Sequence, residues 1–305
     1  MALYDIPAPA KINLFLHVVG RRPDGYHLLE TVFRFVGLYD WLDIDSRSDG
    51  RIVREGQALE HVPEHDDLVV RAARLLQQAT GVSQGAQISY RKGIPHGGGL
   101  GGGSSDAAST MIALNRLWKT GLDRKQLMQL GLRLGADVPV FLFGQPAFAQ
   151  GIGEELSAIA VPDRHYVVVQ PQQSVPTAGV FSAPDLTRNT KPIKIAVFAD
   201  WQKQNAPENG LFTRGYFGSN DLEPVVFSRY PVVEQASRML GQLGVTARMS
   251  GSGSCLFAEF VTNEEAGFFK QQISSKMQGC NSNFAVVVKD AWVCPGLQEH
   301  PLINW

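Results

Sequence analysis

The residues best suited to do chemistry lie in one glycine-rich segment, which reads Pro95-His96-Gly97-Gly98-Gly99-Leu100-Gly101-Gly102-Gly103-Ser104-Ser105. Glycine lets the backbone approach a ligand closely and adopt positive φ without strain. The segment leads into a predicted helix, whose N-terminus offers unpaired N–H groups and the positive end of its dipole. Loop and helix together predict an anion site, most often one for phosphate. A flexible linker is the alternative, but linkers rarely open directly onto an amphipathic helix.

Two familiar phosphate-loop patterns fit this segment poorly. The P-loop pattern requires a lysine after its last glycine, and the segment has none there. Gly97, Gly99 and Gly102 satisfy the dinucleotide pattern G-x-G-x-x-G, which a run of glycines also matches by chance. The preceding residues 86–91 alternate apolar and polar side chains, as a half-buried antiparallel strand does and a dinucleotide-binding strand does not. A dinucleotide oxidoreductase therefore stays open as an alternative only through the glycine spacing.

The helix predicted after the loop has one apolar face, formed by Ala107, Met111, Leu114 and Trp118. We expect Ser104 or Ser105 to cap its N-terminus. Asp106 would then lie in the first turn, where a carboxylate matches the helix dipole. The sequence gives equal weight to that role and to a metal ligand.

Two charged residues elsewhere could take part in catalysis. Alternation along residues 10–14 places Lys11 and Asn13 on one face of a predicted strand. A solvated strand face is the commoner setting for a lone lysine. Asp137 follows a Gly135-Ala136 break at the end of a predicted helix, where a side chain can point into a cleft. The residues alone favour a turn or capping aspartate there.

Length, charge and cysteine content restrict the class of protein. The chain has 305 residues, which is enough for one large or two ordinary domains. Its formal net charge is −1 and it has no basic block, so the sequence does not indicate nucleic acid as a partner. Apolar runs are too short for a membrane span, and the N-terminal residues do not read as a signal peptide. Cys255, Cys280 and Cys294 are odd in number and widely spaced, which predicts neither disulfides nor zinc but a reducing, cytoplasmic compartment.

Periodicity along the chain predicts a mixed α/β protein. Strands are expected over residues 10–19, 31–38, 166–170, 256–260 and 284–289. Helices are expected over residues 68–78, 124–134 and 232–243. The polar stretch 187–219 is expected to be a surface insertion.

Three motifs in chain order resemble the GHMP kinases, the family of galactokinase, homoserine kinase and mevalonate kinase. The first is Pro9-Ala10-Lys11-Ile12-Asn13-Leu14-Phe15-Leu16, with Asp24-Gly25-Tyr26-His27 downstream. The second is the loop Pro95 to Ser105, and the third is Gly251-Ser252-Gly253-Ser254-Cys255. Residues 135–141 also fit the family, so the resemblance runs from residue 9 to about residue 256.

This resemblance implies a fold and an activity. The fold is α/β, in the sense of an α+β two-domain kinase with its active site in the cleft between the domains. Residues 1–160 would resemble the second domain of ribosomal protein S5, and residues 161–305 would be ferredoxin-like. The activity is ATP-dependent phosphorylation of a small-molecule alcohol with Mg²⁺ as cofactor. A monomer or weak homodimer without nucleic-acid or membrane partners is expected.

The resemblance also implies roles for individual residues. Asp137 would be the base that takes the proton of the acceptor hydroxyl, and Lys11 would keep it ionised. The segment 95–105 would bind ATP, and Asn13 would lie near the acceptor hydroxyl or its phosphate. Gly251 and Gly253 would let the late loop approach the catalytic centre, although a tight turn before a strand explains them equally well.

Three aromatic residues are implied to recognise a cytidine diphosphate-linked sugar alcohol. Tyr26 would stack on the base, His27 would hydrogen-bond to it, and Phe181 would form a second wall. Residues of a surface turn and an ordinary buried phenylalanine are the alternatives. Asp106 replaces a neutral residue of some relatives, so Mg²⁺ is expected to offset its charge, although the magnesium ligands are not predicted. A kinase for another alcohol such as homoserine or mevalonate, an inactive metabolite sensor and an RNA-binding module remain as rival functions.

Overall fold

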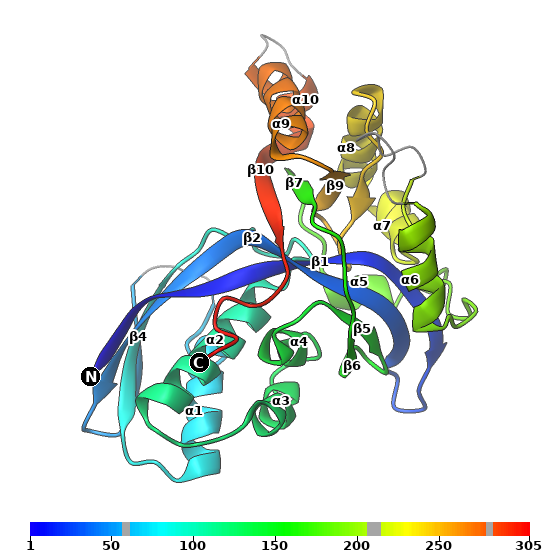
Figure 1. Cartoon of the computed structure of the whole chain (residues 1–305). Helices are drawn as coiled ribbons and strands as arrows, with labels where there is room; N and C mark the ends of the chain where they lie inside the picture. The colour runs from blue at the N-terminus through cyan, green and yellow to red at the C-terminus, as the bar shows by residue number, and fades with distance from the viewer. Residues whose placement is uncertain (57–61, 206–214, 279–282) are drawn as a thin grey trace.

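The computed structural model of the chain describes residues 1–56, 62–205, 215–278 and 283–305. Two long antiparallel strands, β1 (Ala2–Arg21) and β2 (His27–Arg47), run through the molecule and belong to both halves (Figure 1). Register shifts within their pairing let these strands bend and twist along their length. Both strands are much longer than the sequence predicts, and Lys11 lies in the middle of β1.

The first half packs helices against one face of the sheet. Strands β3 (Ile52–Glu55), β4 (Gly85–Arg91), β5 (Ala147–Gln150) and β6 (Glu155–Ala158) join β2 there, directly or through a neighbour. The helices are α1 (Leu68–Thr80), α2 (Gly102–Leu117), α3 (Arg124–Leu132) and α4 (Val138–Phe143). Their apolar faces and the sheet enclose one core, which includes Phe35, Leu42, Ile88, Met111, Leu114 and Phe141.

The second half forms another antiparallel sheet with its own helices. Its strands are β7 (His165–Pro171), β8 (Arg248–Met249), β9 (Leu256–Phe260) and β10 (Val288–Leu297). Its helices are α5 (Thr177–Phe181), α6 (Ile195–Gln204), α7 (Glu223–Arg229), α8 (Pro231–Gln242), α9 (Asn263–Gln278) and α10 (Asn283–Val287). Strand β10 pairs with both β7 and β2, and thereby joins the two sheets.

Most predicted elements are present, with three corrections. The predicted strand over residues 284–289 is wrong in its first part, because Phe284 and Val287 pack on the core from helix α10 and β10 begins only at Val288. The N-cap position of α2 is Gly101, and no side chain caps the helix; Ser104 and Ser105 lie inside it. The helix therefore starts earlier than expected, and Asp106 lies beyond its first turn.

Two other expectations are only partly covered by the structure. The predicted surface insertion 187–219 contains α6, which buries Phe198 against Phe15 with 5.7 Å between ring centroids. Residues 206–214 of that stretch, like Cys280, lie outside the described residues. The expected domain boundary at 160/161 lies between β6 and β7 and stays a prediction.

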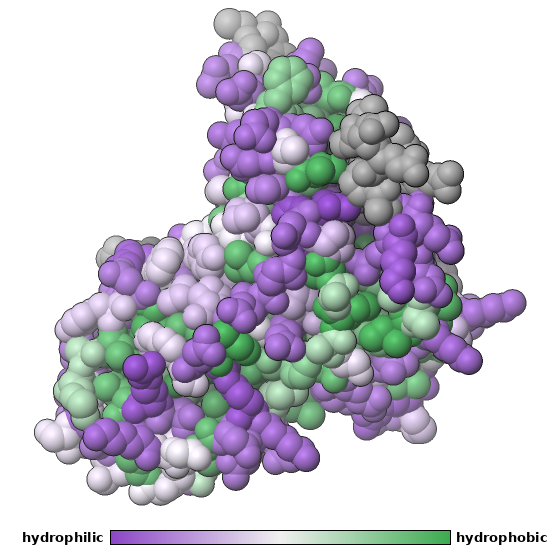
Figure 2. All heavy atoms as spheres, viewed as in Figure 1, coloured by the Kyte–Doolittle hydropathy of each residue, from purple (hydrophilic) through white to green (hydrophobic). Residues whose placement is uncertain are grey.

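The described helices include none that is both long and apolar enough to cross a membrane. Figure 2 shows hydrophilic side chains over most of one face of the molecule, with apolar side chains gathered in smaller patches.

Candidate active site

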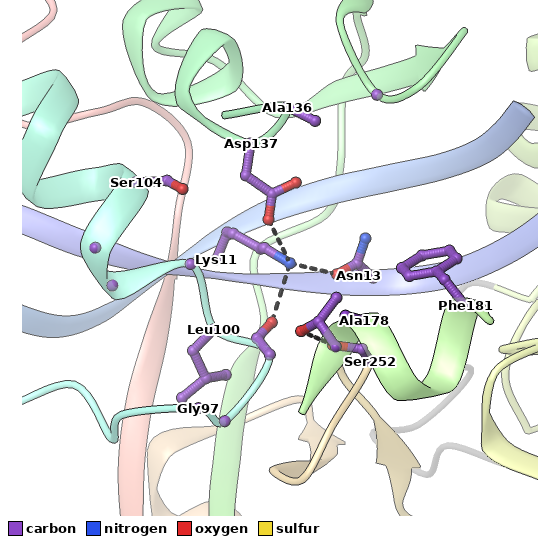
Figure 3. A pocket seen from close by; sticks show the side chains of 18 of the residues that line it. Lys11, Asn13, Gly97, Leu100, Ser104, Ala136, Asp137, Ala178, Phe181 and Ser252 are labelled. Atoms are coloured by element: carbon purple, nitrogen blue, oxygen red, sulfur yellow. Dashed lines mark hydrogen bonds and ion pairs between the residues drawn. The ribbon is translucent and has the colours of Figure 1, made fainter. Parts of the chain in front are cut away.

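A cavity of about 910 Å³ lies between the two halves, and residues from both line it. The first half contributes the middle of β1, the glycine-rich segment and residues 136–137. The second half contributes α5 and the late loop at residues 251–252. Figure 3 shows these segments converging on Lys11.

Lys11 is buried and all of its ammonium protons have acceptors. Its Nζ donates to Asn13 Oδ1 at 2.7 Å and to the Gly99 carbonyl at 3.0 Å, and it forms an ion pair with Asp137 Oδ2 at 3.3 Å (Figure 3). The side chain of Lys11 is only 4% exposed, whereas that of Asp137 is 37% exposed. The solvated strand face is therefore not the setting of this lysine. The pair leaves the carboxylate accessible from the cavity while one of its oxygens is held.

Asp137 occupies its place because of the helix that follows it. The residue is the N-cap of α4, but its side chain makes no capping hydrogen bond within the described part of the chain. Pro139 lies in the first turn of that helix and cannot donate a backbone hydrogen bond. The carboxylate is thus free of the capping role and turns toward Lys11.

Asn13 is held from both ends of its amide. Its Nδ2 donates to Thr31 Oγ1 at 2.9 Å, and its Oδ1 accepts from Lys11. Its backbone N–H donates to Ser250 Oγ at 3.3 Å, which ties β1 to the late loop. The amide orientation is fixed, and one N–H remains for a ligand.

The glycine-rich segment packs directly against the late loop. Cys255 donates its backbone N–H to the Gly98 carbonyl at 3.1 Å, and Ser250 Oγ donates to the Gly99 carbonyl at 3.0 Å. Gly99 has φ of +72°, and a Cβ there would lie 2.1 Å from the Ser250 carbonyl oxygen. Only glycine satisfies both the conformation and the close approach at this position.

The late loop places its two predicted glycines differently. Gly251 lines the cavity, and a Cβ on it would lie 3.3 Å from Lys11 Nζ. Gly253 packs its backbone against Met249 Sδ and does not line the cavity. Ser105 is likewise buried in α2, away from the cavity lining, whereas the rest of the segment from Pro95 to Ser104 contributes to it.

The start of α2 is suited to bind an anion. Gly101 adopts φ of +74° and no side chain within the described residues caps the helix. The first backbone N–H groups of the helix are then available to a ligand at the cavity.

The three predicted aromatic residues lie together at the other end of the cavity. Tyr26 follows the turn between β1 and β2 and is 59% exposed. His27 is buried, and its ring centroid lies 5.2 Å from that of Phe181 on α5. Burial lowers the pKa of His27, with further lowering by the positive charges of Arg188 and Arg21. A flat ligand can therefore meet two ring faces and a neutral imidazole here.

Sequence reasoning missed a buried charge cluster beside the glycine-rich segment. Lys92 Nζ donates to Asp40 and, at 2.6 Å, to Asp106 Oδ2. Burial raises the pKa of Asp106 well above its usual range. Lys92 is thus the cation next to Asp106, and no local pattern links it to Asp40, which precedes it by 52 residues. Within the described ranges, no group of three His, Cys, Asp or Glu side chains is arranged to hold a metal ion.

Comparison with known proteins defines the class. The model of the GHMP kinases N terminal domain matches residues 67–145, and that of the GHMP kinases C terminal domain matches residues 203–279. The chain belongs to the GHMP kinase family and is an ATP-dependent kinase. The family resemblance and the two-domain α/β fold class are thereby confirmed.

Particular relatives narrow the comparison. The chain is 58% identical to the 4-diphosphocytidyl-2-C-methyl-D-erythritol kinase of Bordetella parapertussis, over 100% of this chain and 99% of that protein. It is 52% identical to the kinase of the same name from Thiobacillus denitrificans, over 98% of this chain and 97% of that protein. A crystal structure of 4-(cytidine 5'-diphospho)-2C-methyl-D-erythritol kinase matches with a TM-score of 0.76 and 32% identity, covering 97% of this chain and 99% of that chain.

Proposed function

We propose that this chain transfers the γ-phosphate of ATP to the 2-hydroxyl of 4-diphosphocytidyl-2-C-methyl-D-erythritol, in the non-mevalonate route to isopentenyl diphosphate. The observation that carries the proposal is the placement of the Lys11–Asp137 pair. It faces a cavity with an anion-binding helix terminus at one end and the Tyr26, His27 and Phe181 rings at the other. The near-full-length identity to kinases of that name supports the same substrate.

Proton removal falls to Asp137. Its accessible carboxylate accepts the proton of the attacking hydroxyl, while the Lys11 ammonium stabilises the charge and fixes the orientation. Lys11 also donates to the Gly99 carbonyl, so the same lysine fixes the position of Asp137 relative to the glycine-rich segment. Phosphoryl transfer depends mainly on such positioning and charge stabilisation.

The glycine-rich segment would hold the phosphates. Backbone N–H groups from Gly97 to Ser104 approach them without side chains in the way, and the N-terminus of α2 adds its dipole. Gly251 closes the opposite side and leaves room beside Lys11. Asn13 would orient the acceptor hydroxyl through its remaining N–H.

The residues present fit a magnesium ion carried by the nucleotide. Asp106 Oδ1 and Ser105 Oγ are both buried without a hydrogen-bond partner among the described residues. Mg²⁺ is usually bound through one or two protein oxygens together with substrate phosphates. We propose Asp106 Oδ1 as its protein contact, because Asp106 lines the cavity whereas Ser105 does not, and the ion would neutralise charge on the transferring phosphoryl group there.

Tyr26, His27 and Phe181 would bind the cytosine end of the substrate. This arrangement leaves the linked sugar alcohol to extend toward Asp137 along the cavity. We further propose a monomer or weak homodimer in the cytoplasm, without nucleic-acid or membrane partners. The net charge of −1 is in keeping with a small-molecule partner.

Release of ADP from magnesium-ATP tests the proposal. Turnover should occur with 4-diphosphocytidyl-2-C-methyl-D-erythritol and not with homoserine, mevalonate or galactose as acceptor. Turnover with one of those three alcohols instead would contradict the proposed substrate and identify that alcohol as the acceptor. ATP binding without turnover on any of the four would point to a sensor.

A further inference from the structure

Arg188 contacts both components of the aromatic end of the cavity. It lies between α5 and α6, and its Nε donates to His27 Nε2 at 3.0 Å. Its Nη atoms donate to backbone carbonyls at the end of α5 and just after it, at 3.4 Å for Phe181, 2.5 Å for Ala183 and 3.0 Å for Leu186. One guanidinium therefore fixes the His27 ring and the turn that positions Phe181.

The bond to His27 determines where the imidazole carries its proton. A guanidinium has only donors, so Nε2 of His27 must accept with its lone pair. The neutral ring then carries its proton on Nδ1. Protonation of Nε2 as well would place two donors against each other beside a positive charge, which is unfavourable.

Nδ1 is consequently the ring atom left to meet a ligand. It has no hydrogen-bond partner among the described residues, and the ring lines the cavity next to Tyr26 and Phe181. An N–H at this atom can donate to the N3 acceptor of cytosine, the ring atom that carries a hydrogen in uracil. It cannot accept from the N3–H of uracil, and a donor facing a donor leaves both unpaired.

We propose that Arg188 is a positioning residue that holds His27 in its Nδ1–H form and thereby makes the site select cytosine over uracil. The inference rests on the proposed function in assuming that a pyrimidine base binds at this end of the cavity. Arg188 acts through His27 and Phe181 and touches no reacting atom.

Nitrogen NMR of the His27 ring and binding of CDP and UDP test the proposal without any need for turnover. The wild-type ring should show a protonated Nδ1, and CDP should bind at least about tenfold more tightly than UDP. In Arg188→Met the Nε2–H form should appear and the CDP-to-UDP ratio should fall about tenfold. Arg188→Lys, which keeps the charge but not the planar fork, should also lose most of the selectivity.

Arg229→Gln is the matched control. Arg229 donates to the Gly179 carbonyl of α5 and to Asp185, but it does not contact His27. This variant should keep both the Nδ1–H form and the selectivity. If Arg188→Met fails to fold, Arg188→Lys and the wild-type ring still decide the question.

Kinetics separate this inference from the proposed function. With cytidine- and uridine-linked substrates, Arg188→Met should raise KM for the cytidine compound and leave kcat unchanged. A wild-type ring protonated on Nε2, or an unchanged CDP-to-UDP ratio in both Arg188 variants, would overturn the role of Arg188. Failure of the wild type to phosphorylate the cytidine substrate, with CDP selectivity intact, would overturn only the proposed function.

Discussion

At the scale of single residues, Lys11 shows how a buried charge is tolerated. A buried ammonium is costly unless each proton finds an acceptor. Asn13, Gly99 and Asp137 supply those acceptors from three separate segments of the chain. The orientation of the Asp137 carboxylate is therefore set by the fold and not by local sequence.

Asp137→Asn tests the proposed base. The amide keeps the shape of the carboxylate but cannot take the proton, so kcat should fall by about 10²–10⁴ while ATP affinity stays unchanged. Steady-state kinetics and titration with a non-hydrolysable ATP analogue measure the two effects. Asp200→Asn, an exposed position on α6, serves as the control and should keep full turnover. Turnover at the wild-type rate in Asp137→Asn would remove this residue from the mechanism.

Part of the site follows from sequence and part does not. Alternation places Lys11 and Asn13 on one strand face, and both line the cavity. The contact between Arg188 and His27 joins residues 161 positions apart in the chain, and no sequence pattern near either residue predicts it. Lys92 was missed for the same reason, because a lone lysine after a strand gives no sign of two buried carboxylate partners.

At the scale of elements, the glycine-rich segment depends on contact with the late loop. Gly99→Ala would force a Cβ to within 2.1 Å of the Ser250 carbonyl at positive φ, so the two loops must separate. We expect the kcat/KM for ATP to fall at least about 100-fold, because loop geometry positions the phosphates. Gly267→Ala is the control, since a Cβ at this position on helix α9 would meet nothing within 4 Å. Equal losses in both variants would contradict this account.

The junction between β4 and α2 depends on Lys92. Lys92→Met would leave Asp40 and Asp106 buried without their cation, so the free energy of unfolding should fall by about 3–5 kcal/mol. Asp106→Asn removes one carboxylate and leaves Lys92 paired with Asp40, so its cost should be much smaller. Urea unfolding of both variants measures the difference. Similar stability of Lys92→Met and the wild type would show that the cluster does not stabilise the fold.

A helix or strand is predicted correctly from the sequence where its apolar residues follow a single helical or strand spacing. Helix α1 follows its apolar spacing and begins at the Asp67 N-cap, whose side chain accepts from the Val69 N–H at 2.9 Å. The β-branched run Val286-Val287-Val288 suits a strand by composition. Tertiary packing assigns Val287 to helix α10 and Val288 to β10, because both of these side chains are buried in the core of the second half while Val286 is exposed.

At the scale of the whole molecule, the end of the chain joins the two halves. After β10 the chain returns to the first half, where the C-terminus lies near α2 (Figure 1). Arg124 donates to the carbonyls of Leu302 and, at 3.0 Å, of Ile303. Leu302 packs in the core of the first half. No sequence motif marked this segment, because its contacts are made with backbone groups and a distant core.

His300 couples this C-terminal segment to pH. The residue is fully buried, and its Nδ1 accepts from the Leu302 N–H at 3.1 Å. Burial, together with the charge of Arg124, lowers the pKa of His300 from 6.5 to about 3. Between these two values the unfolded chain binds a proton that the folded chain does not, so acid favours unfolding. The contribution of His300 is complete above about pH 6.5 and is lost progressively as the pH falls.

Denaturant unfolding at pH 7 and pH 5 measures this coupling. Titration of His300 should lower the free energy of unfolding of the wild type by about 2 kcal/mol between the two pH values. His300→Asn keeps an acceptor for the Leu302 N–H but cannot be protonated, so this part of the pH dependence should disappear. His65→Asn, at a side chain that is 76% exposed, is the control and should retain the wild-type dependence. If His300→Asn loses as much stability on acidification as the wild type, then protonation at this position does not govern the attachment of the C-terminal segment.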